Sequence, residues 1–231
     1  MIGGSSLTNR GPATGSSLRW QHEVARTRRP ARIALLLLPL ALLFAFTGCL
    51  SRPALLCQTF ALQSPAPTGA AAAKGDCILT LRTVEVSSLF QGRSLAYRTG
   101  ADSYELDAYA SFLVPPNRAL AIPLCAYLRN SGAFQGVVEP GSLLVANTFL
   151  EVHVGELYGD FRQADKPAAV LSIRLLLFRG GNQKGPELLF QKDYSRSIAL
   201  PAKTAAAVVA GWDKALAEIM AEATSDLAAA K

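Results

Sequence analysis

The sequence has 231 residues and a formal charge of +6, from 23 basic and 17 acidic side chains. The positive excess lies at the N-terminus, because residues 1–48 hold six arginines and one glutamate and leave 17 basic and 16 acidic residues from Cys49 onward. A nearly neutral remainder argues against a nucleic-acid-binding protein. Its 183 residues suffice for one domain with a hydrophobic core and a tether.

The first predicted element is an export signal. Arginines precede an apolar stretch of fourteen residues, 33–46, which fits the core of a signal peptide and is too short to span a bilayer. The small residues Thr47 and Gly48 follow, as signal peptidases require. The sequence Phe46-Thr47-Gly48-Cys49 resembles a bacterial lipobox, although leucine is more usual in place of Phe46.

The lipobox resemblance implies that Cys49 receives diacylglycerol through a thioether and becomes the N-terminus of the mature protein. An uncleaved anchor, or a secreted protein cut near Gly48, is the alternative. Leu50 and Ser51 lack the aspartate that retains lipoproteins in the inner membrane, so we expect the periplasmic face of the outer membrane of a Gram-negative bacterium. Residues 1–25 are long for the front of a signal peptide, which raises the alternative of a later start codon.

Three regions follow from this pattern. Residues 1–48 form a lipoprotein signal peptide with an N-terminal extension, 49–76 a lipidated cysteine and a Pro/Ala-rich tether, and 77–231 the folded domain. Prolines and an alanine run make the tether unfit for a packed core. The apolar segment 54–62 interrupts it and is expected to dock as an extended edge segment.

The first half of the domain predicts strands followed by a helix. Alternating apolar residues predict a strand over 77–86, and turn glycines separate two further strands over 93–99 and 103–112. Pro115-Pro116 then opens a helix that ends at Gly132, a residue suited to a left-handed cap. Pro123 either begins this helix or kinks it.

The second half predicts a meander and a long helix. Alternation predicts a strand over 143–158, with Leu144, Ala146, Leu150, Val152 and Val154 on one face and Asn147, Glu151 and His153 on the other, then strands over 168–178 and 187–195. Pro201 opens a helix whose apolar stripe lies against the sheet. The fold class is therefore α+β, an antiparallel or mixed sheet with two packed helices. The stripe comprises Ala205, Val208, Val209, Trp212, Leu216, Ile219, Met220, Ala223 and Leu227.

The cysteines allow at most one disulfide once Cys49 is acylated. Cys57, Cys77 and Cys125 remain in an oxidising compartment. Cys77 pairs with Cys125 if the first strand meets the first helix; otherwise all three are free thiols. Their spacing matches no zinc motif, so neither a metal nor a cofactor is expected.

No set of residues predicts catalysis. His153 is the sole histidine after Cys49 and is expected to be an exposed strand residue. The stretch 180–187 has the glycine spacing of a phosphate loop, but Pro186 and Glu187 replace the residues that bind phosphate and metal, so it predicts a hairpin turn. Acidic pairs such as Asp102 with Glu105, or Asp160 with Asp165, are expected to be solvated. The chain is therefore not expected to be an enzyme.

The order of these features resembles the ABC-type transport auxiliary lipoprotein family, the PqiC-like proteins. The resemblance covers about 77–228 and lies mainly in the stretches "SLAYRTGADSYELDAYASFLVPP", "LRNSGAFQGVV" and "LLVANTFLEVHVGEL". It implies a non-catalytic periplasmic lipoprotein that serves an MCE-domain substrate-binding protein, an ABC permease and an ATPase in moving phospholipid or sterol-like lipid between membranes. It also implies a homo-oligomeric ring.

Candidate contact residues and rival functions complete the interpretation. Exposed Tyr and Arg favour interfaces, so Tyr97, Arg98, Tyr104 and Tyr109 are candidates for partner contact, with half-buried strand residues as the alternative. An outer-membrane lipoprotein that supports cell-wall synthesis or envelope assembly is a rival function. An enzyme with dispersed acidic residues is a second rival.

Overall fold

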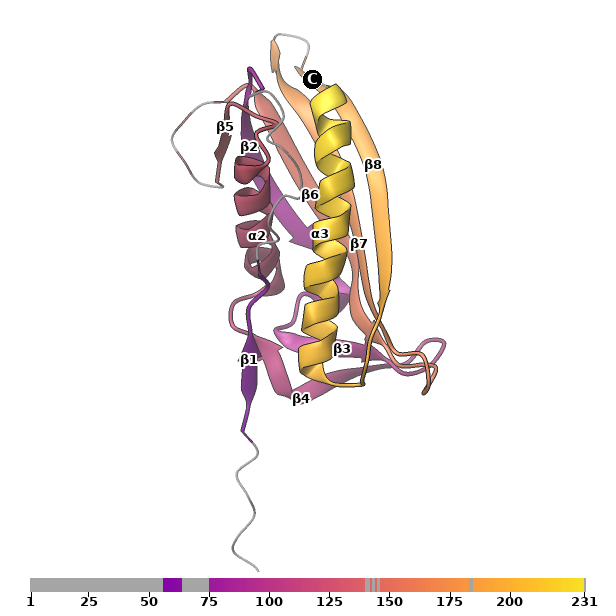
Figure 1. Ribbon diagram of the computed structural model, residues 1–231. Coiled ribbons are helices and arrows are strands. Elements are labelled where there is room, and N and C mark those ends of the chain that lie inside the picture. Colours follow the sequence, from indigo (N-terminus) through magenta and orange to yellow (C-terminus); the bar gives the residue numbers. More distant parts are fainter. Residues whose placement is uncertain are drawn as a thin grey trace, which may run out of the picture. The chain divides into compact units, whose positions relative to one another are not determined.

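The structure is a computed structural model that describes residues 56–63, 75–139, 142, 144, 146–182 and 185–230. The predicted signal peptide, Cys49 and most of the predicted tether lie outside this part. Figure 1 shows a sheet with two helices on one side. The elements in chain order are β1 (Gln58–Phe60), β2 (Ile78–Val86), the 3-10 turn η2 (Ser88–Phe90), β3 (Ser94–Arg98), β4 (Tyr104–Phe112), α2 (Pro116–Asn130), β5 (Gly136–Val138), β6 (Thr148–Asp160), β7 (Ala168–Asn182), β8 (Gly185–Ala199) and α3 (Ala205–Ala229).

The eight strands form one mixed sheet built around β6. The long strands β6, β7 and β8 form the predicted antiparallel meander. On the other edge of β6, β2 pairs in parallel with residues 148–154 of β6, and β3 pairs in parallel with residues 159–160 near its C-terminal end. β5 then pairs with β2, while β4 and β1 follow β3. The fold class expected from the sequence is confirmed.

The edge segment predicted over 54–62 docks as β1. It pairs in parallel with the end of β4, where Gln58 lies opposite Ala110 and Phe60 opposite Phe112. Leu62, just after β1, is buried. The chain is thus joined to the domain well before Cys77, and residues 64–74 lie outside the described part.

The helix α2 begins at Pro116 and continues through Pro123, which is buried within it. It ends as predicted, because Gly132 takes a left-handed conformation with φ of 70°. Cys125 and Leu124 lie on its buried face. The proline therefore neither starts nor ends the helix, and the helix packs on β2 and β5.

Several predicted boundaries were wrong: β7 continues to Asn182 instead of ending at 178, and β8 runs over Gly185–Ala199 instead of 187–195. The strand predicted from 143 begins only at Thr148, and Leu144, predicted to face the core, is 55% exposed. The last helix begins at Ala205 rather than Pro201, because the Thr204 side chain caps it by accepting the Ala207 N–H at 3.2 Å. Such a cap satisfies one of the free amides of the first turn.

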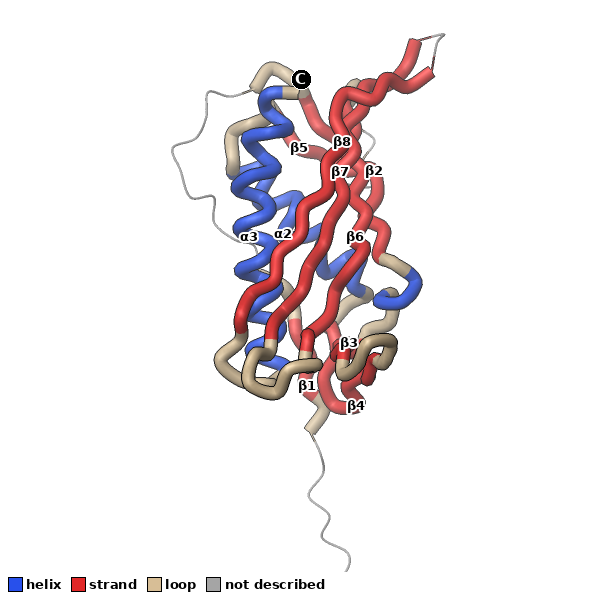
Figure 2. Tube along the Cα trace, turned by 90° about the vertical axis from the view of Figure 1, so that its right-hand side faces the viewer, coloured by secondary structure: helices blue, strands red, loops and turns tan. Residues whose placement is uncertain are grey.

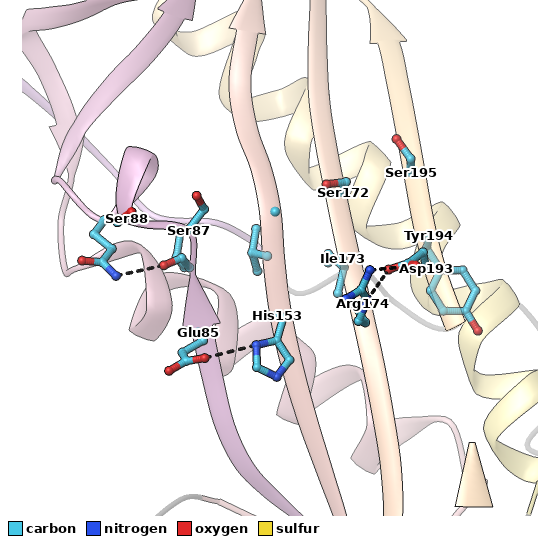
Figure 3. A pocket seen from close by; sticks show the side chains of 14 residues that line it. Glu85, Ser87, Ser88, His153, Ser172, Ile173, Arg174, Asp193, Tyr194 and Ser195 are labelled. Atoms are coloured by element: carbon cyan, nitrogen blue, oxygen red, sulfur yellow. Dashed lines mark hydrogen bonds and ion pairs between the residues drawn. The ribbon is translucent and has the colours of Figure 1, made fainter. Parts of the chain in front are cut away.

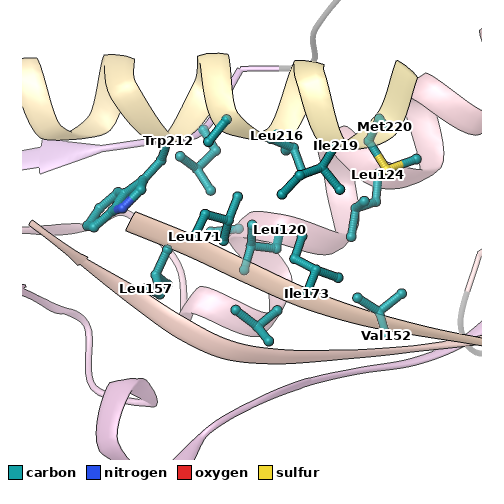
Figure 4. Close-up of a cluster of buried hydrophobic side chains, with 14 of the residues drawn as sticks. Leu120, Leu124, Val152, Leu157, Leu171, Ile173, Trp212, Leu216, Ile219 and Met220 are labelled. Atoms are coloured by element: carbon teal, nitrogen blue, oxygen red, sulfur yellow. The ribbon is translucent and has the colours of Figure 1, made fainter. Parts of the chain in front are cut away.

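The core lies between the sheet and the two helices. The predicted stripe of α3 packs on β7 and β8, and all its members except the half-buried Ala205 are buried. Figure 4 shows Trp212, Leu216 and Ile219 pointing from α3 toward Leu171 and Ile173 of β7, with Leu120 and Leu124 of α2 nearby. The side chains of alternate strand positions meet them, as a two-layer fold requires.

Neither α2 nor α3 covers the opposite face of the sheet, as Figure 2 shows for β6, β7 and β8; only the short η2 borders this face in the described part of the chain. Glu151 and His153 of β6 point to this face, as predicted, and each is half-buried. No described helix is both long and apolar enough to cross a membrane.

Candidate functional site

The four residues predicted to contact a partner lie on one hairpin. β3 and β4 run antiparallel, with Tyr97 opposite Glu105 and Arg98 opposite Tyr104. Tyr109 follows on β4 after an irregularity in the pairing. The structure therefore brings these residues to the same end of the sheet, although they differ in how much of each side chain is free.

Tyr97 is committed to internal contacts. Its ring stacks on Phe161 with a centroid separation of 4.8 Å, and its hydroxyl donates to Asp107 Oδ2 at 2.7 Å. Burial, and then the bond to Asp107, raise the pKa of Tyr97. The second oxygen of Asp107 accepts the N–H groups of Tyr109 and Ala110 at 2.8 and 2.9 Å. This carboxylate therefore stabilises β4 where its pairing with β3 is irregular.

Arg98 is also engaged within the domain. Its guanidinium bonds to the Ala101 carbonyl and to the Tyr158 hydroxyl at 3.4 Å. It lies over the rings of Tyr104 and Tyr158, at 5.7 and 5.9 Å from their centroids. Phe90 of η2 contacts both rings and completes the cluster. Such cation–π contacts stabilise a packed arrangement.

Tyr104 and Tyr109 keep exposed surface. Tyr104 is 39% and Tyr109 is 49% exposed, and Leu106 between them is 65% exposed. Partner contact by the four residues stays a prediction. Of the four, Tyr104 and Tyr109 have the most side-chain surface exposed for such a contact. The sequence analysis did not select Leu106 as a contact residue. An apolar residue in a strand is expected to face the core, and the sequence does not show that this face of β4 is left exposed.

A row of polar, ionisable side chains crosses the open face of the sheet. Adjacent strands align Glu85, His153, Arg174 and Asp193 as successive cross-strand neighbours. His153 Nδ1 lies 3.1 Å from Glu85 Oε2, and Arg174 binds Asp193 with two bonds of 2.7 and 3.2 Å. Figure 3 shows the two pairs side by side on β2, β6, β7 and β8. His153 is therefore paired with Glu85 and is not an isolated surface histidine.

Beside this row the face is hollowed by about 650 Å³. Its lining includes small residues, namely Gly155, Ser172 and Ser195, and a Cβ at Gly155 would lie 3.0 Å from Ser172 Oγ. Serine catalysis would need a hydroxyl bonded to the histidine. Within the described part of the chain, no serine is hydrogen-bonded to His153, and no three ligand residues gather to hold a metal ion.

The acidic pairs differ from expectation in one case. Asp102 and Glu105 are exposed, as predicted. Asp160 instead binds Arg162, with its Oδ2 2.6 Å from Nη2, and the bonds from Arg162 lower the pKa of Asp160. The hairpin predicted over 180–187 is confirmed, because Asn182 of β7 pairs with Gly185 of β8.

The three cysteines that the structure describes are free thiols. Cys57 is exposed, Cys77 is half-buried, and Cys125 is buried in α2. The disulfide considered between Cys77 and Cys125 is therefore absent from the structure. Burial raises the pKa of Cys125 to about 11, so this thiol stays protonated near neutral pH.

Comparison with known proteins decides the family. The sequence model of the ABC-type transport auxiliary lipoprotein component matches residues 60–223. The chain belongs to this family. The match begins at the last residue of β1 and ends within α3, so it covers nearly all of the packed domain of this ABC transport auxiliary lipoprotein. Among curated proteins, none matches the sequence.

Solved structures agree on the fold of this auxiliary lipoprotein. A protein from Xanthomonas campestris is similar with a TM-score of 0.65 and 14% identity, over 75% of this chain and 96% of that protein. An uncharacterised protein is similar with a TM-score of 0.55 and 20% identity, over 75% and 97% of the two chains. At these identities the likeness is one of fold.

Proposed function

We propose that the protein is a non-catalytic component of an MCE-type ABC transporter, anchored to the periplasmic face of the outer membrane through Cys49. Its permease and ATPase would act at the inner membrane, and its MCE-domain protein would carry phospholipid or sterol-like lipid between the membranes. The observation that carries this proposal is the family match over 60–223, which lies downstream of the predicted export signal over 1–48 and of Cys49.

The geometry of the domain supports a binding role. The hollow on the open face is open to solvent, and its lining mixes charged and hydroxyl groups with apolar residues, whereas sites that enclose a lipid are deep and predominantly apolar. The row of Glu85, His153, Arg174 and Asp193 offers paired polar side chains to another protein. Lipid would therefore be carried by the partner, and this chain would position that partner.

The first experiment tests the anchor. Cys49→Ser should abolish labelling by radioactive palmitate and leave the precursor uncleaved, because only a thiol forms the thioether. Cys57→Ser is the matched control, since this exposed cysteine lies eight residues further on and should not be acylated. Label retained by Cys49→Ser would refute the assignment.

The second experiment tests the partner. The native lipoprotein, purified from membranes in detergent, should co-purify the MCE-domain protein. Recovery of a cell-wall synthase in its place would support the rival envelope-assembly function. The family resemblance also implies a ring of copies, which light scattering of the same preparation would measure.

A further inference from the structure

The chain enters the domain at β1, and several contacts fix it there. The Phe60 carbonyl accepts the Leu113 N–H at 2.7 Å, and the Gln63 N–H donates to Asp213 Oδ1 of α3 at 2.8 Å. Leu62 between them is only 8% exposed. The segment from Gln58 to Gln63 is therefore held by both the sheet and a helix.

This attachment leaves a short connection to the acylation site. Eight residues, 50–57, separate Cys49 from β1. Fully extended, nine Cα steps span about 32 Å at most. As a flexible coil they span roughly 15–18 Å. A domain that began at Cys77 would have a far longer connection.

The domain is longer than this connection. β7 and β8 each have 15 residues, which corresponds to roughly 50 Å of strand. Figure 1 shows β1 and β4 at one end of the sheet and the C-terminus of α3, with the β7–β8 hairpin, at the other. A lipid anchor at Cys49 therefore keeps the β1–β4 end toward the bilayer and the hairpin away from it.

The β1–β4 end presents apolar side chains. Leu56 before β1 is 83% exposed, and Leu106 and Tyr109 on β4 are 65% and 49% exposed. Asp107, the acidic residue between the last two, is occupied by Tyr97 and by two backbone N–H groups. Leucine and tyrosine side chains suit the interface between lipid headgroups and water.

We propose that this end of the domain lies on the membrane, with Leu56, Leu106 and Tyr109 in the headgroup layer of the bilayer that holds the Cys49 acyl chains. The proposal rests on the proposed lipidation of Cys49. It assigns Tyr109 to a phospholipid surface, and it leaves the open face of the sheet and the β7–β8 hairpin free for the transporter.

The experiment uses the mature lipoprotein in vesicles of phosphatidylethanolamine and phosphatidylglycerol. Cys57→Ser and Cys77→Ser remove the accessible thiols, and an environment-sensitive NBD label is placed at Leu106→Cys. The matched control is Leu188→Cys, because Leu188 is similarly exposed at 57% but lies near the β7–β8 hairpin. If Leu106→Cys fails to fold, Tyr109→Cys replaces it.

The label at position 106 should be quenched several-fold more strongly by spin-labelled phospholipid than the label at 188, with a blue-shifted emission. Equal quenching at the two positions, in a preparation whose mass confirms acylated Cys49, would overturn this orientation and leave the proposed function standing. The orientation would also be overturned if the emission of the label at position 106 changed only when MCE-domain protein was added. A mass without acyl chains would overturn the anchor and the orientation together.

Discussion

The indole N–H of Trp212 donates to the Val170 carbonyl at 3.1 Å across the interface between α3 and β7. The ring is fully buried and stacks on Phe112 of β4 at a centroid distance of 5.6 Å. One side chain thus joins the last helix to two parts of the sheet that are distant in sequence. This contact makes Trp212 a central element of the core.

Truncation of Trp212 should be costly. Trp212→Ala should lower the free energy of unfolding by about 3–5 kcal/mol, since it leaves a large cavity. Trp212→Phe keeps an aromatic ring but loses the hydrogen bond to Val170. It should lower the free energy of unfolding by roughly 1 kcal/mol for the lost bond, and by a further amount for the small cavity that the shorter side chain leaves. Urea unfolding followed by circular dichroism at the helix signal measures both. The exposed Leu188→Ala is the control, and an equal loss there would refute the central role of Trp212.

Gly211 allows α3 to approach β7 closely. A Cβ at this position would lie 2.5 Å from Ala169 Cβ and 2.7 Å from Leu200 Cδ2. Alanine favours a helix over glycine by about 1 kcal/mol, but overpacking costs more, so Gly211→Ala should destabilise the domain by roughly 1–2 kcal/mol. The double variant Gly211→Ala/Ala169→Gly should recover part of this loss. An increase in stability from Gly211→Ala alone would contradict the close approach.

Asp226 should make stability depend on acid pH. It accepts bonds from Lys192 Nζ at 2.7 Å and from the Tyr194 hydroxyl at 2.8 Å, and the bond from Lys192, then that from Tyr194, lower its pKa below the ordinary 3.8. A carboxyl whose pKa is lowered by folding stabilises the folded state above its unfolded pKa, and this contribution disappears as the pH falls through the folded value.

Asp226→Asn should therefore be less stable than the parent near neutral pH by about 1 kcal/mol, a value reduced by the partial exposure of the site. The difference should shrink as the pH falls below 3.8. Unfolding midpoints measured across this range test it, with Asp193→Asn on the open face as a control of smaller effect. A difference that stays constant with pH would exclude the ionised carboxylate as the cause.

The thiols should differ in reactivity. In the folded lipoprotein, Cys57 should react at once with a disulfide reagent, whereas Cys125 should react only after the helix opens, because burial keeps its thiol protonated. Under denaturant three thiols should titrate, those of Cys57, Cys77 and Cys125. Cys57→Ser should remove the rapid phase. A single titratable thiol under denaturant would reveal a bridge between Cys77 and Cys125.

The sequence identified many residues of the candidate site, but it did not predict how these residues contact one another. Tyr97, Arg98, Tyr104 and Tyr109 were selected by residue type, and the structure places them on one hairpin. Their accessibility was not predictable, because it depends on Tyr158 of β6, on Phe161 in the loop after β6 and on Phe90 of η2. For the same reason, the sequence analysis singled out His153 but did not predict that Glu85 on the neighbouring strand is its partner.

The sequence by itself determined the local elements: the alternation of Leu150, Val152 and Val154, the helical stripe of α3, and the left-handed cap at Gly132. These follow from spacings of two to four residues along the chain, which backbone geometry converts directly into a buried face. Only the tertiary structure decided how β1, β2, β3 and β5 pair with strands distant in the sequence. The row across the open face and the docking of β1 both depend on contacts between distant residues, whose register no local spacing specifies.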